Sequence, residues 1–189
     1  MQWRNSEARW GSTAQLLHWS IALLIIGLVA VGLLMQELPN SLFKVKVYGW
    51  HKSTGLLVFV LVLVRLLWRL LDRRPPNPDD MPRWQQRLSS GAHGLLYVLM
   101  IGMPLSGWLY NSAANFPLRW FGLFSVPSLA APDPALKQLA RQMHEYGFYV
   151  LAALFTLHVG AALHHHYVKR DATLTRMLPR HSDPKDLTS

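Results

Sequence analysis

The chain of 189 residues contains no cysteine and few acidic residues. Without cysteine it can form no disulfide bond, no thiolate metal site and no cysteine nucleophile. Its 10 Asp and Glu stand against 19 Lys and Arg, which gives a formal net charge of +9. An excess of this sign can indicate nucleic-acid binding, but the basic residues are scattered between long apolar runs. We therefore expect no nucleic-acid partner, and the apolar runs become the main evidence for the fold.

Four apolar runs occupy residues 16–35, 55–71, 94–110 and 146–163. A helix crosses a bilayer with about 20 apolar residues, and each run reaches or approaches this length with its flanks. The first run follows Arg4 and Arg9 as a signal peptide core would, but no small-residue cleavage pattern comes after it, which favours an uncleaved anchor. We predict an all-α, integral membrane four-helix bundle, with residues 1–189 as one domain and spans at about 14–36, 48–71, 91–111 and 143–167.

The basic residues predict how the chain crosses the membrane, because Lys and Arg are enriched on the cytoplasmic side. Eleven belong to the two terminal tails and the second connection: Arg4, Arg9, Arg73, Arg74, Arg83, Arg87, Lys169, Arg170, Arg176, Arg180 and Lys185. Six belong to the opposite side: Lys44, Lys46, Lys52, Arg119, Lys137 and Arg141. This excess predicts that both termini are cytoplasmic.

The third connection, residues 111–142, is long and has two distinct parts. The segment FPLRWFGLF carries aromatic residues suited to a membrane interface. The segment DPALKQLARQMH predicts a short amphipathic helix, capped by Asp133, that leads into the last span. Together they could form a lid on the outer face.

Four histidines fall at two depths in the predicted bundle. His144 and His158 are fourteen residues apart, which places them on one helix face about 21 Å apart along its axis. With the N terminus inside, His51 and His144 lie at the outer level, and His18 and His158 lie at the inner level. A lone histidine in a membrane helix is more often packed or hydrogen-bonded than a ligand. Two pairs at matched depths instead predict the axial ligands of two low-spin haem irons.

Arg65 lies fourteen residues after His51 and therefore faces the same way at the inner level. An arginine inside a span is costly unless it is paired, and a haem propionate is a suitable partner. Snorkelling to the inner interface is the alternative, and it is favoured for Arg69. Small residues near the histidines would leave room for a flat macrocycle, although plain helix packing also uses them: Gly55, Gly147, Ala161 and Ala162.

Further histidines carry weaker signals. His93 begins the third span on the inner side, and an interfacial position, a propionate contact and a quinone contact all stay open for it. Consecutive helical residues diverge by about 100°, so the run His164, His165 and His166 cannot close on one metal ion and is predicted to be interfacial. No nucleotide, flavin or hydrolytic motif is present, so any redox chemistry belongs to the haem.

Four segments resemble the bacterial cytochrome b561 family of di-haem, four-helix membrane cytochromes: LLHWSIALL, GWHKSTGLLVFVLVLVRLLWR, MHEYGFYVLAALFTLHVGAALHHHY and KRDATLTRMLPR. The resemblance covers nearly the whole chain. It implies two haem b groups held by four histidines, at positions that match His18, His51, His144 and His158, in the bacterial inner (plasma) membrane. It also implies electron transfer between a donor and membrane ubiquinone, and it suggests oxidation of superoxide to oxygen as the sharper activity.

These features are compatible with three alternative functions. The first is an oxidoreductase that passes electrons from an outer-side donor, most of all superoxide, to ubiquinone without an obligate protein partner. The six outer basic residues would draw a small anion to the site, unless they are ordinary solvated charges. The second is a cytochrome b subunit that anchors a hydrogenase or dehydrogenase, although such subunits commonly carry an additional span. The third, a haem-free transporter or structural bundle, is disfavoured by the paired depths.

Overall fold

The computed structural model describes residues 2–73, 75–76 and 81–179, which form four long helices. These are α1 (Ser12–Glu37), α2 (Leu42–Leu71), α3 (Arg83–Ala113) and α4 (Pro134–His164). By length and composition all four can cross a membrane. The prediction of an all-α membrane bundle is therefore confirmed, while α3 and α4 begin about eight to nine residues before the predicted spans.

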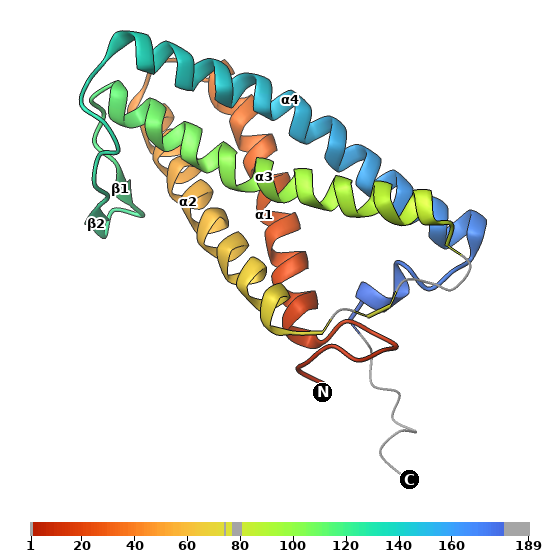
Figure 1. Cartoon of the computed structure of the whole chain (residues 1–189). Helices are drawn as coiled ribbons and strands as arrows, with labels where there is room; N and C mark the ends of the chain where they lie inside the picture. Colours follow the sequence, from red (N-terminus) through yellow and green to blue (C-terminus); the bar gives the residue numbers. More distant parts are fainter. Residues whose placement is uncertain (1, 74, 77–80, 180–189) are drawn as a thin grey trace.

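The helices pack as two pairs, with α1 against α2 and α3 against α4, and the pairs meet through α2 and α3 (Figure 1). Both ends of the described chain lie at the same end of the bundle. There the Trp10 backbone N–H donates to the Arg176 carbonyl, and the Gln15 side-chain amide donates to the Leu178 carbonyl. This arrangement is the one that an even number of spans requires. Three residues of the charge count, Arg74, Arg180 and Lys185, lie outside the described residues.

A small aliphatic core lies midway along the bundle. Ile21 and Ile25 of α1 pack there against Val58 and Val62 of α2, and α3 adds partly buried side chains to the same cluster. Many large apolar side chains elsewhere on the helices are exposed, as they are in a protein whose surroundings are lipid. Ile21 and Ile25 also line the cavity beside His18 and His158, so the core borders that level of the bundle.

Helix α4 begins where the sequence predicts a cap. The Asp133 carboxylate accepts hydrogen bonds from the backbone N–H groups of Ala135 and Leu136, at 2.8 and 3.0 Å. The predicted amphipathic helix is the first part of α4 itself, since Arg141 and Glu145 form an ion pair one turn apart, at 2.7 Å, across its junction with the span. At the opposite end α4 widens into a π-helical turn, η1 (His165–Lys169), and a 3₁₀ turn, η2 (Thr175–Met177), comes after it.

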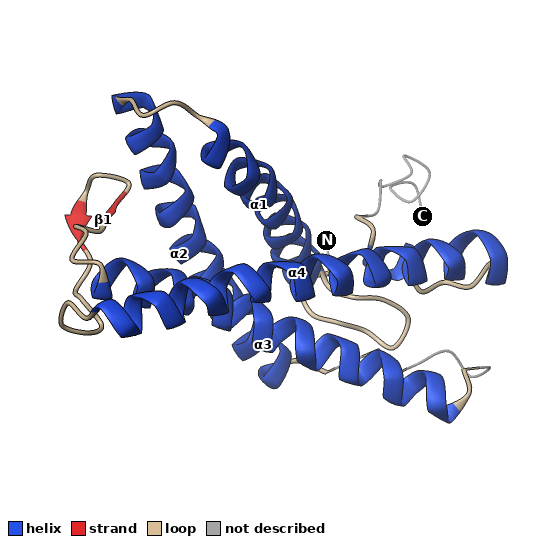
Figure 2. Cartoon of the chain, turned by 90° about the horizontal axis from the view of Figure 1, so that it is seen from above, coloured by secondary structure: helices blue, strands red, loops and turns tan. Residues whose placement is uncertain are grey.

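A β-hairpin that the sequence did not predict is part of the connection that leads from α3 to α4 along the chain (Figure 2). It pairs β1 (Arg119–Trp120) with β2 (Phe124–Ser125) through a turn in which Phe121 and Gly122 have φ values of 46° and 78°. Two successive positive φ values with a glycine second are typical of a type I′ hairpin turn. The hairpin is bound to α2 through Ser53, whose hydroxyl accepts from the Phe121 N–H and donates to the Arg119 carbonyl. It therefore covers the end of α2 that carries His51, which is the end that the charge count predicts to be outer.

Candidate functional site

The outer histidine pair joins α2 to α4. The ring centroids of His51 and His144 are 6.4 Å apart, with 76° between the ring planes. His144 Nδ1 lies 3.0 Å from the Met103 carbonyl oxygen and 3.1 Å from the Ser106 hydroxyl. A carbonyl only accepts, so Nδ1 carries the proton and the neutral ring keeps a free lone pair on Nε2. This second-sphere partner is typical of a histidine that binds a metal.

Two glycines make room for the outer rings. A Cβ atom on Gly32 of α1 would lie 3.3 Å from His51 Cε1, and one on Gly107 of α3 would lie 3.2 Å from His144 Cε1. These glycines were missed in the sequence, because each is on a different helix from the ring it faces. Of the predicted small residues, Gly55 borders open space, but the space beside Gly147 is filled by the Met103 sulfur.

The inner pair joins α1 to α4. The ring centroids of His18 and His158 are 6.3 Å apart, with 70° between the ring planes. Both rings line a cavity whose other walls come from all four helices and include Arg65, His93, Tyr97 and Phe155. The structure thus brings together the two pairs that the sequence predicts by depth.

Arg65 lies at the inner level, directed at His18. Its Nη1 atom is 2.8 Å from His18 Nδ1, and its guanidinium also lies 6.0 Å from the centroid of the Tyr97 ring. A guanidinium only donates, so Nδ1 accepts here and neutral His18 carries its proton on Nε2. Ligation through Nε2 needs the proton on Nδ1. His18 can therefore bind a metal in this way only if Arg65 gives up this contact for another partner, as a carboxylate would provide.

The spacing of both pairs fits a metal held between two imidazoles. A metal–imidazole bond is about 2.0 Å and the nitrogen lies about 1.2 Å from the ring centroid, so opposed imidazoles on one ion have centroids about 6.4 Å apart. The observed separations are 6.4 and 6.3 Å. The Nδ1 atom of His51 is buried and has no hydrogen-bond partner among the described residues, so this ring has a polar atom still to be satisfied. The outer ring spacing therefore fits bis-imidazole ligation as it stands, and the inner pair fits it once Arg65 turns away from His18 Nδ1.

The remaining histidines occupy different surroundings. The His93 ring lies 5.2 Å from that of His158, so it belongs to the inner site. His165 Nδ1 lies 2.5 Å from the Asp171 carboxylate, in a contact between η1 and the segment after it. Burial alone would raise the pKa of Asp171, but hydrogen bonds from Thr173 and His165 outweigh it and hold that pKa below its usual value. Among the described residues, the His164 ring contacts that of His165, the His166 ring contacts that of Tyr167, and no three metal-ligating side chains come together to hold an ion.

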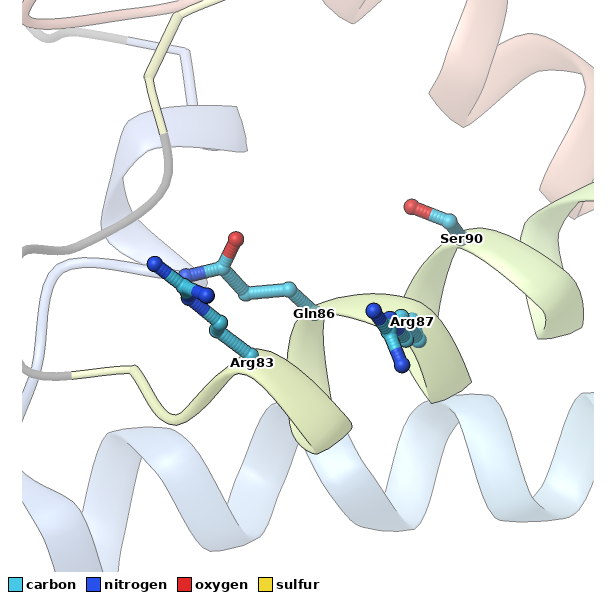
Figure 3. A pocket seen from close by; sticks show the side chains of 4 residues that line it. All are labelled: Arg83, Gln86, Arg87 and Ser90. Atoms are coloured by element: carbon cyan, nitrogen blue, oxygen red, sulfur yellow. The ribbon is translucent and has the colours of Figure 1, made fainter.

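A separate polar hollow of about 580 Å³ lies on the first two turns of α3. Figure 3 shows the side chains that line it: Arg83, Gln86, Arg87 and Ser90. None of them is shared with the cavity between the inner histidines. The hollow therefore belongs to the basic end of the bundle and not to the histidine sites.

Comparison with known proteins indicates the family of the chain. Residues 9–180 match the family model described as prokaryotic cytochrome b561. The chain is 32% identical to cytochrome b561 homolog 2 of Escherichia coli (strain K12), over 96% of this chain and 97% of that protein. It is 30% identical to cytochrome b561 homolog 1 of the same organism, over 91% of this chain and 98% of that protein.

A third relative is the probable superoxide oxidase CybB of Yersinia pestis, with 29% identity over 87% of this chain and 92% of that protein. The family match extends over all four helices and both histidine pairs. The chain therefore belongs to the prokaryotic cytochrome b561 family, whose members bind haem b and transfer electrons in the membrane.

Proposed function

We propose that this protein is a di-haem oxidoreductase that takes electrons from a donor at its outer face and passes them to membrane ubiquinone. The observation that carries the proposal is the pair of imidazole separations, 6.4 Å for His51 with His144 and 6.3 Å for His18 with His158. One such pair can arise from packing. Two pairs with the spacing of bis-imidazole ligation, at opposite levels of one membrane bundle, are best explained by two haem b groups.

The side chains around each pair have distinct tasks in this proposal. Met103 and Ser106 orient His144 and fix the proton on its Nδ1, which leaves Nε2 to ligate. Arg65 supplies a positive charge at the inner level, where it can bind a propionate bidentately. Each haem, when bound, supplies a one-electron couple between ferric and ferrous iron. The chain itself supplies ligands, charge and an apolar surrounding that excludes water.

The two levels are far enough apart to carry charge across much of the membrane. His144 and His158 both lie on α4, fourteen residues and therefore about 21 Å apart, against a hydrocarbon core of roughly 30 Å. The aliphatic core of Ile21, Ile25, Val58 and Val62 borders the inner level. We place the histidine pair near the hairpin on the outer side and both termini in the cytoplasm, because the charge count favours that orientation.

Superoxide is the donor that we propose for the outer site. The relative from Yersinia pestis is named a probable superoxide oxidase, and the outer end of this chain carries basic side chains close to the ligands. Lys52 follows His51 directly and its ammonium lies 5.5 Å from the centre of the Phe116 ring. In the balanced reaction, each of two superoxide ions loses one electron and leaves as O₂, and one ubiquinone gains two electrons and two protons to become ubiquinol.

Haem analysis of the purified protein tests the proposal. A pyridine haemochrome assay should give two haems b per chain, and superoxide should reduce them in a preparation without stoichiometric partner proteins. Fewer than two haems per chain would contradict the paired sites. A soluble dehydrogenase or hydrogenase that co-purifies stoichiometrically, with no reduction by superoxide, would instead support an anchoring subunit that relays a partner's electrons.

A further inference from the structure

The inner site contains a third imidazole that the two-haem scheme does not use. The His93 ring, on α3, lies 5.2 Å from the His158 ring at an interplanar angle of 85°. Both rings line the cavity that also contains His18 and Arg65. The outer pair has no such neighbour: among the described residues, no third histidine ring contacts His51 or His144. The difference between the two sites therefore centres on His93.

Hydrogen bonding holds His93 in the form that binds metals. Its Nδ1 atom lies 2.6 Å from the carbonyl oxygen of Ser89, one turn earlier in α3. The proton is therefore on Nδ1, and the neutral ring has its lone pair on Nε2. His144 has the same arrangement with the Met103 carbonyl. In this form His93 has no second N–H group, so it cannot donate to a propionate unless it takes up another proton.

The ring separations show which ligand His93 could replace. His93 and His158 are 5.2 Å apart, which is too close for opposite sides of one metal ion, where about 6.4 Å is needed. As ligands opposite each other on one ion they are therefore excluded, so with His18 as the other ligand they can act only as alternatives. No other helix of the described chain packs closely against the neighbouring glycines, because a Cβ atom on either Gly91 or Gly94 would meet no atom within 4 Å.

We propose that His93 is a reserve axial ligand of the inner haem, able to take the place of His158 opposite His18. The proposal rests on the inner pairing given under the proposed function. It predicts an asymmetry between the sites: the inner haem tolerates the loss of its α4 ligand, whereas the outer haem does not tolerate the loss of His144, for which the described chain offers no substitute.

The test compares variants of the full-length protein by haem content and by low-spin signals in electron paramagnetic resonance. His158→Ala should keep two haems per chain, both low-spin, with the inner signal shifted because its ligand has changed. His93→Ala should keep both low-spin signals, because His158 still ligates the inner haem. The double variant His158→Ala/His93→Ala should lose the inner low-spin signal. The matched outer variant, His144→Ala, should lose the outer one. In the inner-site variants, the outer haem signal reports that the chain is folded.

The outcomes separate this proposal from the pairing beneath it. If His158→Ala alone loses the inner low-spin signal while His93→Ala keeps both, the reserve ligand is wrong and the pairing of His18 with His158 stands. If His93→Ala loses the inner low-spin signal while His158→Ala keeps it unshifted, His93 is the ordinary ligand and not a reserve. If the double variant keeps two unshifted low-spin haems, neither histidine is a ligand, and the proposed inner site itself is wrong.

Discussion

The outer and inner histidine pairs have almost the same ring separation, 6.4 and 6.3 Å, but different surroundings. Neutral groups hold the outer rings: a backbone carbonyl orients His144, and Gly32 and Gly107 give the rings space. At the inner pair a guanidinium contacts His18 and a third imidazole adjoins His158. The outer site is thus fixed by shape and backbone, whereas the inner site depends on charged and ionisable side chains that can exchange partners.

The largest expected effect comes from removing one ligand at each level. His144→Ala should abolish the low-spin outer haem, and His18→Ala the low-spin inner haem, because each replacement removes a metal–imidazole bond. Haem stoichiometry and redox titration of each variant measure the result. In each case the other haem should keep its spectrum and potential. Loss of the outer haem in His18→Ala, with the inner haem intact, would show that the pairing is wrong.

A larger side chain at Gly107, which faces the His144 ring, should have the next largest effect. A Cβ atom at position 107 already lies 3.2 Å from His144 Cε1, so Gly107→Val forces the ring to move. Overpacking of this kind costs about 1–3 kcal/mol, which corresponds to roughly 5- to 150-fold weaker binding of the outer haem. The matched control is Gly102→Val on the same helix, where a Cβ atom meets nothing within 4 Å. Haem content after detergent dilution compares the two variants, and equal losses would contradict the steric role.

Arg65→Leu should change the inner site in a graded way. If the guanidinium stabilises the inner haem and its added electron, its removal lowers that haem's reduction potential. A unit charge about 8 Å away at an effective dielectric constant near 20 contributes about 2 kcal/mol, or on the order of 80 mV for one electron. Arg69→Leu is the control, because Arg69 lies 5.2 Å from the Tyr97 ring but has no hydrogen bond to His18 among the described residues. Equal shifts in the two variants would indicate general charge effects and not a specific role of Arg65 at the inner haem.

Helical periodicity made the levels of the histidines predictable from the sequence. Fourteen-residue spacings place His144 above His158 and His51 above Arg65, and apolar runs give the number of spans. The hairpin and the glycines opposite the rings could not be predicted from the sequence, because both depend on which residues of separate helices meet. Gly32 meets His51 only because α1 and α2 cross there, and the sequence does not show where two helices cross. In the sequence, the turn at Phe121 is no more than a short aromatic run with one glycine.

The contact between Arg65 and His18 was only partly predictable from the sequence. Periodicity gave the level and direction of Arg65, and the cost of a buried charge indicated that it needs a partner. It could not identify an imidazole as that partner, because His18 is on another helix and the spacing within α2 says nothing about α1. A propionate contact is still a prediction. The same limit explains why the role of His93 stayed open until α3 and α4 could be placed together.

The smallest expected effect concerns the basic residues predicted around the outer pair. The structure distinguishes those that form an ion pair from those that do not. Arg141 pairs with Glu145 at 2.7 Å, so its field at a distance is largely offset. Lys52 is in no ion pair with a carboxylate among the described residues and is adjacent to His51. If superoxide is steered to the outer site, Lys52→Glu should slow haem reduction a few-fold at low ionic strength and flatten its salt dependence. Arg141→Glu changes the net charge by the same amount, and the sequence alone predicts a similar effect. It should change the rate less because the Arg141 side chain is 65% exposed, where salt screens its charge more strongly.

A charge swap sharpens this last comparison. Arg141→Glu combined with Glu145→Arg keeps the net charge and the possibility of an ion pair, so the reduction rate should match that of the unmodified protein. Exposed charges are screened beyond about 8 Å at physiological salt, so the Lys52 effect should shrink as salt rises. Stopped-flow reduction by superoxide at two ionic strengths measures all three variants, with the haem spectra as a control for intact sites. A rate that ignores both salt and Lys52→Glu would exclude steering and favour an uncharged donor such as a quinol.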